Sequence, residues 1–182
     1  HDDGAGIVQS IEVMRALRAT GYQPRHTLRV VLFINEENGN NGGKTYARRA
    51  AEDGLLHVAA VESDAGGGVP RGYSLDAGDA PVARIRSWSD GLDPYGLLSF
   101  RRGGAGVDIG PLKQEMPAGH RPVLVGLRPD SQRYFDYHHS DRDVFETIHK
   151  RELELGAAAL ASMVYLLDRT DWSPEIEFNK EE

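Results

Sequence analysis

The sequence predicts an α/β protein of three layers, in which helices cover both faces of a central, mostly parallel but mixed β-sheet. Three apolar segments rich in β-branched residues, at 27–34, 57–61 and 122–127, have the composition of strands buried on both faces. Helical patterns before the first of these segments, between the first two and after the last supply the covering layers of such a fold.

The first helical pattern follows the opening segment HDDGAG and ends near Gly21. Its apolar residues recur at spacings of three and four, which predicts one buried face made of Ile7, Val8, Ile11, Met14 and Leu17. Asp3 precedes this pattern, where a carboxylate can cap the free amides of the first turn. The clearest helical pattern covers residues 151–170, with an apolar stripe made of Leu153, Ala157, Leu160, Val164 and Leu167.

Smaller elements are predicted between these landmarks. Residues 44–51 and 81–90 are expected to be helical, and residues 69–77 to form a strand at the edge of the sheet. Residues 91–106 have the composition of a loop, residues 107–114 are expected to start a helix with Asp108 near its N-terminal end, and residues 172–182 form an acidic tail. No repeat or linker interrupts the chain, so we expect one domain over residues 1–182.

Composition and charge narrow the class of function. The chain has 182 residues and a net charge of -7, which argues against nucleic acid or an anionic membrane as a partner. No apolar run approaches the roughly 18 residues of a membrane-spanning helix. The chain has no cysteine, so any zinc site must use His, Asp and Glu side chains.

Acidic residues and histidines gather where the predicted elements end. They form four groups: Asp2 with Asp3, Glu36 with Glu37, Glu62 with Asp64, and His138 with His139. Open α/β sheets carry their chemistry just beyond the carboxyl ends of the strands. Because adjacent side chains diverge, one of Glu36 and Glu37 can accept a proton while the other binds a metal; a solvated acidic turn is the alternative. Oxygen and imidazole ligands suit zinc.

Five motifs follow one another along the chain: HDDGAG, FINEENG, ESDAGG, GGAGVDIGPL and YHHSDRD. In this combination the sequence resembles, from His1 to about Asp168, the M28 family of zinc-dependent exopeptidases, most closely its branch of carboxypeptidase Q and related bacterial aminopeptidases. The resemblance implies the family's zinc-peptidase fold with two zinc ions. It also implies that the first strands of the sheet and a further histidine ligand lie upstream of His1. Residues 1–182 are then an incomplete catalytic domain, expected to bind one metal weakly and to be inactive alone.

The matching motifs carry the family's roles onto single residues of this sequence. The resemblance implies that Asp2 bridges the two zinc ions beside a cis Asp2–Asp3 peptide. It implies that Glu36 is the general base, that Glu37 and His139 bind one zinc, and that Asp64 binds the other. The residues expected around the ligands or in the pocket are Asp3, Asp108, Tyr137, His138 and Asp143. Among these, Asp143 is expected to orient the His139 imidazole, and His138 to line the cleft rather than bind metal.

The function implied by these roles is hydrolysis of the terminal bond of short peptides or dipeptides. An acidic rim suits a free α-amino group, which favours aminopeptidase or dipeptidase action. Two alternatives stay open: a single-zinc enzyme similar to glutaminyl cyclase, and a non-catalytic binding domain on a peptidase scaffold. Retention of both Glu36 and Glu37 argues against the first, and retention of the ligands argues against the second. The resemblance also implies a secreted or periplasmic location and allows a homodimer.

Overall fold

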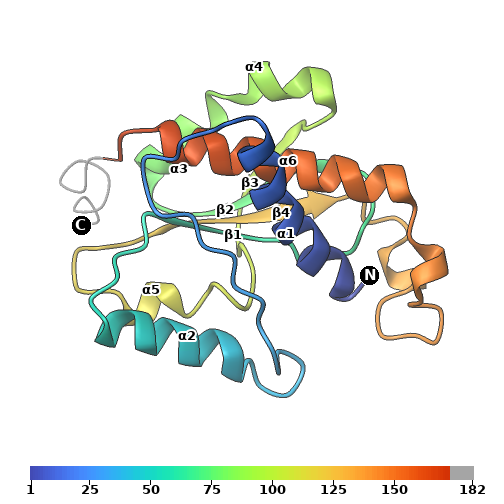
Figure 1. Cartoon of the computed structure of the whole chain (residues 1–182), viewed down its shortest axis with the longest axis horizontal. Coiled ribbons are helices and arrows are strands. Elements are labelled where there is room, and N and C mark those ends of the chain that lie inside the picture. Colours follow the sequence, from blue (N-terminus) through green and yellow to red (C-terminus); the bar gives the residue numbers. More distant parts are fainter. Residues whose placement is uncertain (173–182) are drawn as a thin grey trace.

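The computed structural model describes residues 1–172 (Figure 1). Its α-helices are α1 (Gly4–Ala19), α2 (Asn41–Glu52), α3 (Asp79–Arg86), α4 (Ser89–Leu92), α5 (Leu112–Glu115) and α6 (Lys150–Arg169). Its strands are β1 (Ala59–Glu62), β2 (Pro70–Asp76), β3 (Ser99–Arg102) and β4 (Val123–Pro129). Short 3-10 helices cover Asp93–Tyr95, Tyr134–Asp136 and Phe145–Thr147.

The four strands form one mixed sheet in the order β1-β4-β2-β3. β1 is parallel to β4 and β2 is parallel to β3, whereas β2 and β4 are antiparallel. The central strands are buried on both faces, as their apolar composition predicts: Tyr73, Leu75, Val123 and Val125 belong to the larger apolar core, and Leu124 belongs to the smaller one. The predicted mixed sheet is therefore confirmed.

Helices cover both faces of this sheet, and an apolar core lies on each side. α1, α3 and α6 lie over one face, and α2 and α5 lie over the other (Figure 1). Leu160, Met163 and Leu167 of α6 belong to the larger core, and Ala47 and Ala50 of α2 belong to the smaller one. The predicted three-layer arrangement is confirmed. None of the helices within residues 1–172 combines the length and the apolar character needed to span a membrane.

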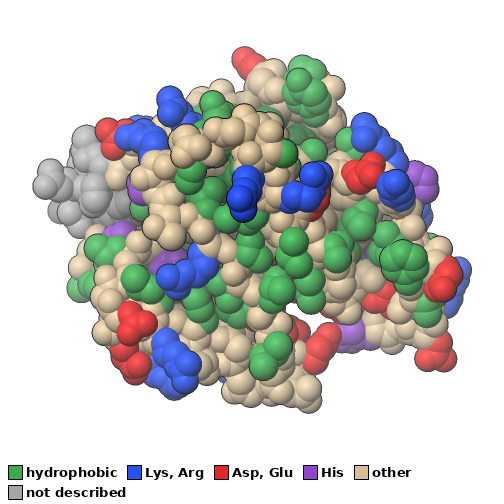
Figure 2. Space-filling model, in the orientation of Figure 1, with side chains coloured by type: hydrophobic (Ala, Val, Ile, Leu, Met, Phe, Trp, Pro, Cys, Tyr) green, Lys and Arg blue, Asp and Glu red, His purple; other side chains and the backbone are tan. Residues whose placement is uncertain are grey.

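The buried face of α1 is not the predicted one. Three of its large apolar residues are exposed, namely Ile7, Val8 and Ile11, and hydrophobic side chains gather over α1 in Figure 2. The helix buries Ala5, Gly6, Gln9 and Val13. Small residues let α1 approach α6, and the buried Gln9 amide donates a hydrogen bond to the Leu153 carbonyl of α6 at 3.3 Å. Because Gln9 is polar, the periodicity of apolar residues did not predict this buried face.

Residues 27–34 do not form the predicted strand. The segment runs as a coil, and the sheet of the described residues does not include it. A groove of about 450 Å³ is lined by Val30, Val31 and Phe33 of this segment and by Val58 and Val61 on the β1 side. A strand needs a neighbour that supplies its backbone hydrogen bonds, so apolar composition alone does not create one.

Smaller predictions were wrong in position. β2 lies inside the sheet rather than at its edge, and β3 falls in the segment predicted to be a loop, where residues 99–102 pair with residues 72–75. α5 starts only at Leu112, so Asp108 lies in a turn before the helix. Residues 173–182, most of the predicted acidic tail, lie outside the described residues.

The start of the 22–34 segment is fixed by a buried carboxylate in the last turn of α6. Asp168 is 5% exposed and accepts hydrogen bonds from the Tyr22 hydroxyl (2.5 Å) and from the backbone N–H groups of Arg25 (2.8 Å) and His26 (2.9 Å). Burial alone would raise the pKa of Asp168, but these hydrogen bonds hold it at about 2. Asp168 therefore stabilises the fold above pH ~4, and this stabilisation is lost as the pH falls towards 2.

Asp168→Ala is expected to lower the free energy of unfolding at pH 7 by about 3 kcal/mol, because it leaves several donors without an acceptor. Urea unfolding followed by circular dichroism measures the change. Asp171→Ala, which removes an exposed carboxylate three residues on, should stay within about 0.5 kcal/mol of the parent protein. Equal unfolding midpoints for the two variants would show that the Asp168 hydrogen bonds do not anchor the segment.

Candidate active site

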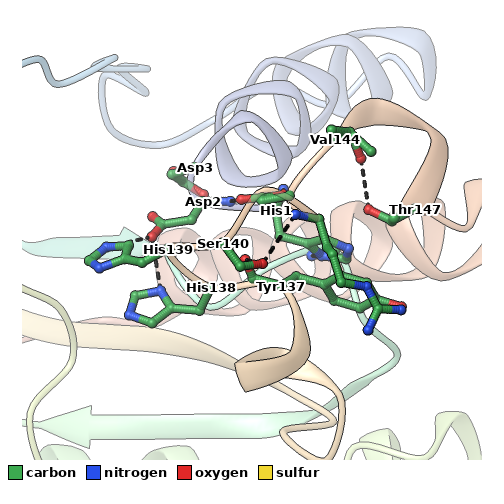
Figure 3. Close-up of polar contacts among 12 residues, drawn as sticks. His1, Asp2, Asp3, Tyr137, His138, His139, Ser140, Val144 and Thr147 are labelled. Atoms are coloured by element: carbon green, nitrogen blue, oxygen red, sulfur yellow. Dashed lines mark hydrogen bonds and ion pairs between the residues drawn. The ribbon is translucent and has the colours of Figure 1, made fainter.

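Three segments far apart in the sequence bring ligand-type atoms together at the N-terminal end of α1. Asp2 precedes α1, Glu37 follows the 27–34 segment, and His138 and His139 lie between β4 and α6. His139 Nε2 lies 2.9 Å from Glu37 Oε1 and 3.2 Å from Asp2 Oδ2. His138 Nδ1 lies 2.9 Å from the same Asp2 oxygen. Figure 3 shows Asp2, His138 and His139 pointing toward one another.

The turn that carries Glu36 and Glu37 owes its shape to the asparagines around it. Asn35 adopts a left-handed conformation with φ 63°, which asparagine tolerates better than most residues. Its side-chain oxygen accepts a hydrogen bond from Asn41 Nδ2 at 2.6 Å, which closes the turn. Glu37 is exposed and reaches His139, whereas Glu36 is half-buried and has no hydrogen bond or ion pair within the described part of the chain. The structure thus separates the two adjacent carboxylates.

Asp2 and Asp3 also point to different partners. The peptide bond between them is cis, as the resemblance implies. Asp3 Oδ1 accepts a hydrogen bond from the Gly6 backbone N–H at 2.9 Å, so Asp3 caps α1 as predicted. The Asp2 carboxylate, which is 12% exposed, faces the two histidines. One aspartate starts the helix and the other joins the group of ligand-type atoms.

Asp64 reaches the same region because α1 packs closely on the end of β1. Ser63 Oγ donates a hydrogen bond to the buried Gln9 Oε1 at 2.7 Å. Gly6 of α1 lies against the Ser63 carbonyl, so closely that a Cβ at this position would overlap it. Asp64 is therefore held beside the N-terminus of α1, near Asp2.

Burial among other acids raises the pKa of several carboxyl groups in this region. Desolvation is the main cause for Asp3, whose pKa rises to about 8, and for Asp64 and Asp108, whose pKa values rise to about 6. The charges of Asp2 and Glu36 raise the pKa of Asp64 further, and Glu36 acts likewise on Asp108. The site thus holds a surplus of negative charge, which a bound cation would neutralise.

The loop that carries Asp108 is held on two sides. The buried Glu62 carboxylate accepts hydrogen bonds from the backbone N–H groups of Val107 (3.0 Å), Asp108 (3.1 Å) and Ile109 (2.9 Å). The Asn40 side chain donates a hydrogen bond to the Val107 carbonyl and so ties the loop to the turn of Glu36. Asp108 Oδ1 is buried and has no hydrogen-bond partner among residues 1–172.

Tyr137 and Asp143 lie behind the ligand-type atoms. The Tyr137 ring stacks on the His1 ring with centroids 4.5 Å apart (Figure 3). Asp143 Oδ2 accepts a hydrogen bond from the Asp2 backbone N–H at 2.8 Å. In the described structure neither residue has a hydrogen bond or ion pair with His139. Asp143 therefore positions the backbone of Asp2, and the contact by which it would orient the His139 imidazole is not seen.

The residues present fit a metal ion. One ligand atom each from Asp2, His138 and His139 lies within 4.8 Å of the other two. His138 Nδ1 is buried and lies 2.9 Å from Asp2 Oδ2, so it can serve as a further ligand atom. Glu37 adds a carboxylate oxygen beside His139. Carboxylate and imidazole ligands of this kind suit zinc.

Sequence reasoning missed two features of this site. His138 was expected to line the cleft, yet its Nδ1 lies among the ligand-type atoms; nothing in the adjacent pair His138-His139 tells which ring turns inward. Glu62 was noted beside Asp64 but was given no role, although it anchors the Asp108 loop. The sequence did contain a signal for the role of Glu62. This acid ends an apolar strand, and a glycine-rich loop elsewhere in the chain can supply free backbone N–H groups to it.

The known proteins that are similar to this chain are peptidases. Residues 1–164 match the sequence profile of peptidase family M28. The chain is 28% identical to mouse carboxypeptidase Q over 170 residues, which are 93% of this chain and 35% of that protein. It is 28% identical to human carboxypeptidase Q over 166 residues, which are 91% of this chain and 34% of that protein. The chain thus spans about a third of the length of these relatives.

A crystal structure of a peptidase M28 precursor from Shewanella amazonensis superimposes with a TM-score of 0.82. It is 27% identical in sequence, and the match covers 94% of this chain and 38% of that one. The match to the profile covers most of the chain, and the fold agrees with it. This chain belongs to peptidase family M28.

Proposed function

We propose that this protein is a zinc-dependent exopeptidase that hydrolyses the terminal peptide bond of short peptides or dipeptides. The observation that carries the proposal is the meeting of Asp2, Glu37 and His139 from three separate segments, with the unpaired Glu36 next to Glu37. Membership of family M28 and the similarity to carboxypeptidase Q support peptidase chemistry.

The described residues suggest how two zinc ions would be held. Asp2, Glu37 and His139 would bind one ion, and Asp2 and Asp64 would bind the other, with His138 Nδ1 as a further ligand atom near Asp2. Bound zinc lowers the pKa of a water ligand to about 7 and polarises a carbonyl group. The surplus of negative charge around Asp64 favours occupation by divalent cations.

Glu36 is the residue to which we assign proton transfer. Its carboxylate is free of hydrogen bonds and ion pairs within residues 1–172, whereas the neighbouring Glu37 is committed to His139. Glu36 takes a proton from the attacking water and passes it to the nitrogen of the leaving amine, as a general base that becomes a general acid. Its position in a turn closed by Asn35 and Asn41 keeps it beside the metal ligands.

Acidic residues around the site favour a substrate with a free α-amino group. The pKa values of Asp3, Asp64 and Asp108 are raised chiefly by burial and further by the negative charge of neighbouring acids, so a positive charge bound there would be stabilised. A protonated amine supplies such a charge. We therefore favour aminopeptidase or dipeptidase action, which hydrolysis of an aminoacyl anilide, a dipeptide and an N-acetylated dipeptide would distinguish. Hydrolysis of the N-acetylated dipeptide alone would overturn this preference.

Glu37→Gln is expected to weaken zinc binding more than about 100-fold. Loss of a residue that only supports a metal ligand costs roughly 10–100-fold in affinity, and this change removes the charge of the ligand itself. Competition with a chromogenic chelator, together with metal analysis, measures the change. Glu115→Gln removes the same charge from an exposed position on α5 and should leave zinc binding unchanged. Near-zero zinc in the parent protein, purified without chelator, would refute the two-zinc site.

A further inference from the structure

The loop at residues 105–110 is built around one buried carboxylate. Glu62 is 8% exposed, and its two carboxylate oxygens accept three successive backbone N–H groups, from Val107, Asp108 and Ile109. Successive N–H groups that point into one concavity form an anion-binding arrangement, and here the protein's own carboxylate occupies it. Gly106, at φ 152°, lies so close to Glu62 that a Cβ would overlap the carboxyl carbon.

The opposite side of this loop is fixed by α2. Gly43, near the start of α2, lies against the backbone of Asp108, where a Cβ would come within 2.5 Å of the Asp108 carbonyl oxygen. Asn40, just before α2, holds the Val107 carbonyl through its side chain. Glu62 and α2 therefore clamp the backbone of Asp108 from two sides, on the segment that follows the Glu36 turn.

The loop held by Glu62 and α2 carries the Asp108 carboxylate, one oxygen of which makes no hydrogen bond that would stabilise the described part of the fold. Asp108 Oδ1 is buried and lacks a hydrogen-bond partner among the residues described. Asn40 links this loop to the Glu36 turn, because its backbone N–H donates a hydrogen bond to the Glu36 carbonyl at 2.8 Å and its side chain donates one to the Val107 carbonyl. Buried polar atoms in folded proteins are nearly always paired, so Asp108 Oδ1, unpaired among residues 1–172 and in a loop tied to the Glu36 turn, points to a role outside the fold.

We propose that Glu62 is a positioning residue of the active site: by anchoring residues 107–109 it holds the Asp108 carboxylate beside Glu36. Without the Glu62 carboxylate, three backbone N–H groups would face a buried space with no acceptor, and the loop would move to find other partners. Asp108 would then leave its place. The catalytic consequence rests on the proposed function, whereas the anchoring itself does not.

Hydrogen exchange tests the anchoring without any need for activity. In Glu62→Gln the amides of residues 107–109 are expected to exchange on the order of 10–100-fold faster, because bonds to a charged acceptor are lost. Glu115→Gln, an equal change of charge at an exposed position on α5, should leave these amides unchanged. Unchanged exchange at residues 107–109 in Glu62→Gln would overturn the proposal.

Kinetics of a double-mutant cycle test whether Glu62 acts through Asp108. In the full-length protein, Glu62→Gln and Asp108→Asn are each expected to lower kcat/KM for an aminoacyl anilide about 10–100-fold, the scale of a displaced active-site group. Combined, they should lose little more than Asp108→Asn alone, since a displaced Asp108 and a neutral one are equally ineffective. A general loss of stability would instead lower kcat/KM by a similar factor in both backgrounds.

The possible results separate this inference from the proposed function. Faster exchange with a non-additive cycle supports the positioning role, whereas losses that multiply in the double variant overturn it. If the full-length protein hydrolyses no peptide, the proposed function fails, while the exchange measurement on residues 1–182 still decides whether Glu62 anchors the loop. Should Glu62→Gln fold poorly, Gly106→Ala, whose Cβ would displace the Glu62 carboxylate, provides a second variant with the same expected exchange pattern.

Discussion

Replacement of Glu36 by Gln is expected to lower kcat for peptide hydrolysis by about 100–10,000-fold while the bound metal stays in place. The glutamine amide keeps the size of the side chain but accepts no proton at neutral pH. Glu36 makes no hydrogen bond or ion pair with Asp2 or His139 in the described structure, so the metal ligands should remain where they are. Steady-state rates of the full-length protein on an aminoacyl anilide, measured beside its zinc content, test both halves of the expectation.

The matched comparison is with the next residue along the chain. Glu37→Gln should lose zinc together with activity, because Glu37 lies 2.9 Å from His139 Nε2 in the group of ligand-type atoms. Glu115→Gln should behave as the parent protein, because this residue is exposed on α5. A Glu36→Gln variant that loses its zinc, or that keeps full activity, would contradict the assignment of Glu36 as the base.

The metal-free protein is expected to lose stability as the pH rises from 5 to 8.5. Burial raises the pKa of Asp3 to about 8, of Glu62 to about 7, and of Asp64 and Asp108 to about 6. These folded-state values lie above those of an unfolded chain, near 4, so the stabilisation is complete below about pH 4 and is lost as the pH rises through 6 to 8. We expect Tm in the presence of a chelator to fall by roughly 10 °C over this range.

Zinc should reverse much of this loss. A ligand at 100 times its Kd stabilises the folded state by about 2.7 kcal/mol, which corresponds to roughly 5–10 °C in Tm. The increase should be larger at pH 8 than at pH 5, because protons compete with the metal for carboxylates and imidazoles. Differential scanning calorimetry with zinc and with a chelator, at both pH values, gives the four Tm values that test this expectation.

Asp3→Asn serves as the control for the pH effect. Asparagine also caps helices, so the hydrogen bond to the Gly6 N–H is kept while the buried charge is removed. The fall in Tm between pH 7 and 8.5 should become shallower in this variant. A metal-free parent protein whose Tm is constant or rises across pH 6–8.5 would show that these carboxyl groups are not buried as described.

Periodicity and composition were sufficient for the outer framework of the fold. Apolar runs predict the strands β1 and β4, and apolar residues at spacings of three and four predict the helices α1 and α6. The helix cap at Asp3 follows from its local position before α1. The same reasoning failed at residues 27–34, because a strand depends on a neighbouring strand that local sequence cannot reveal. It also failed for the buried face of α1, where the polar Gln9 packs inside.

The sequence by itself determined which residue types were available for chemistry: paired acids at strand ends, adjacent histidines in a loop, and no cysteine. It also carried the order of motifs that is typical of family M28. Only the tertiary structure decided which of these side chains meet. Asp2, Glu37 and His139 come together across more than 130 residues of chain, and the adjacent carboxylates of Glu36 and Glu37 separate. The physical reason is that side-chain direction depends on long-range packing, such as α1 against β1, and not on spacing along the chain.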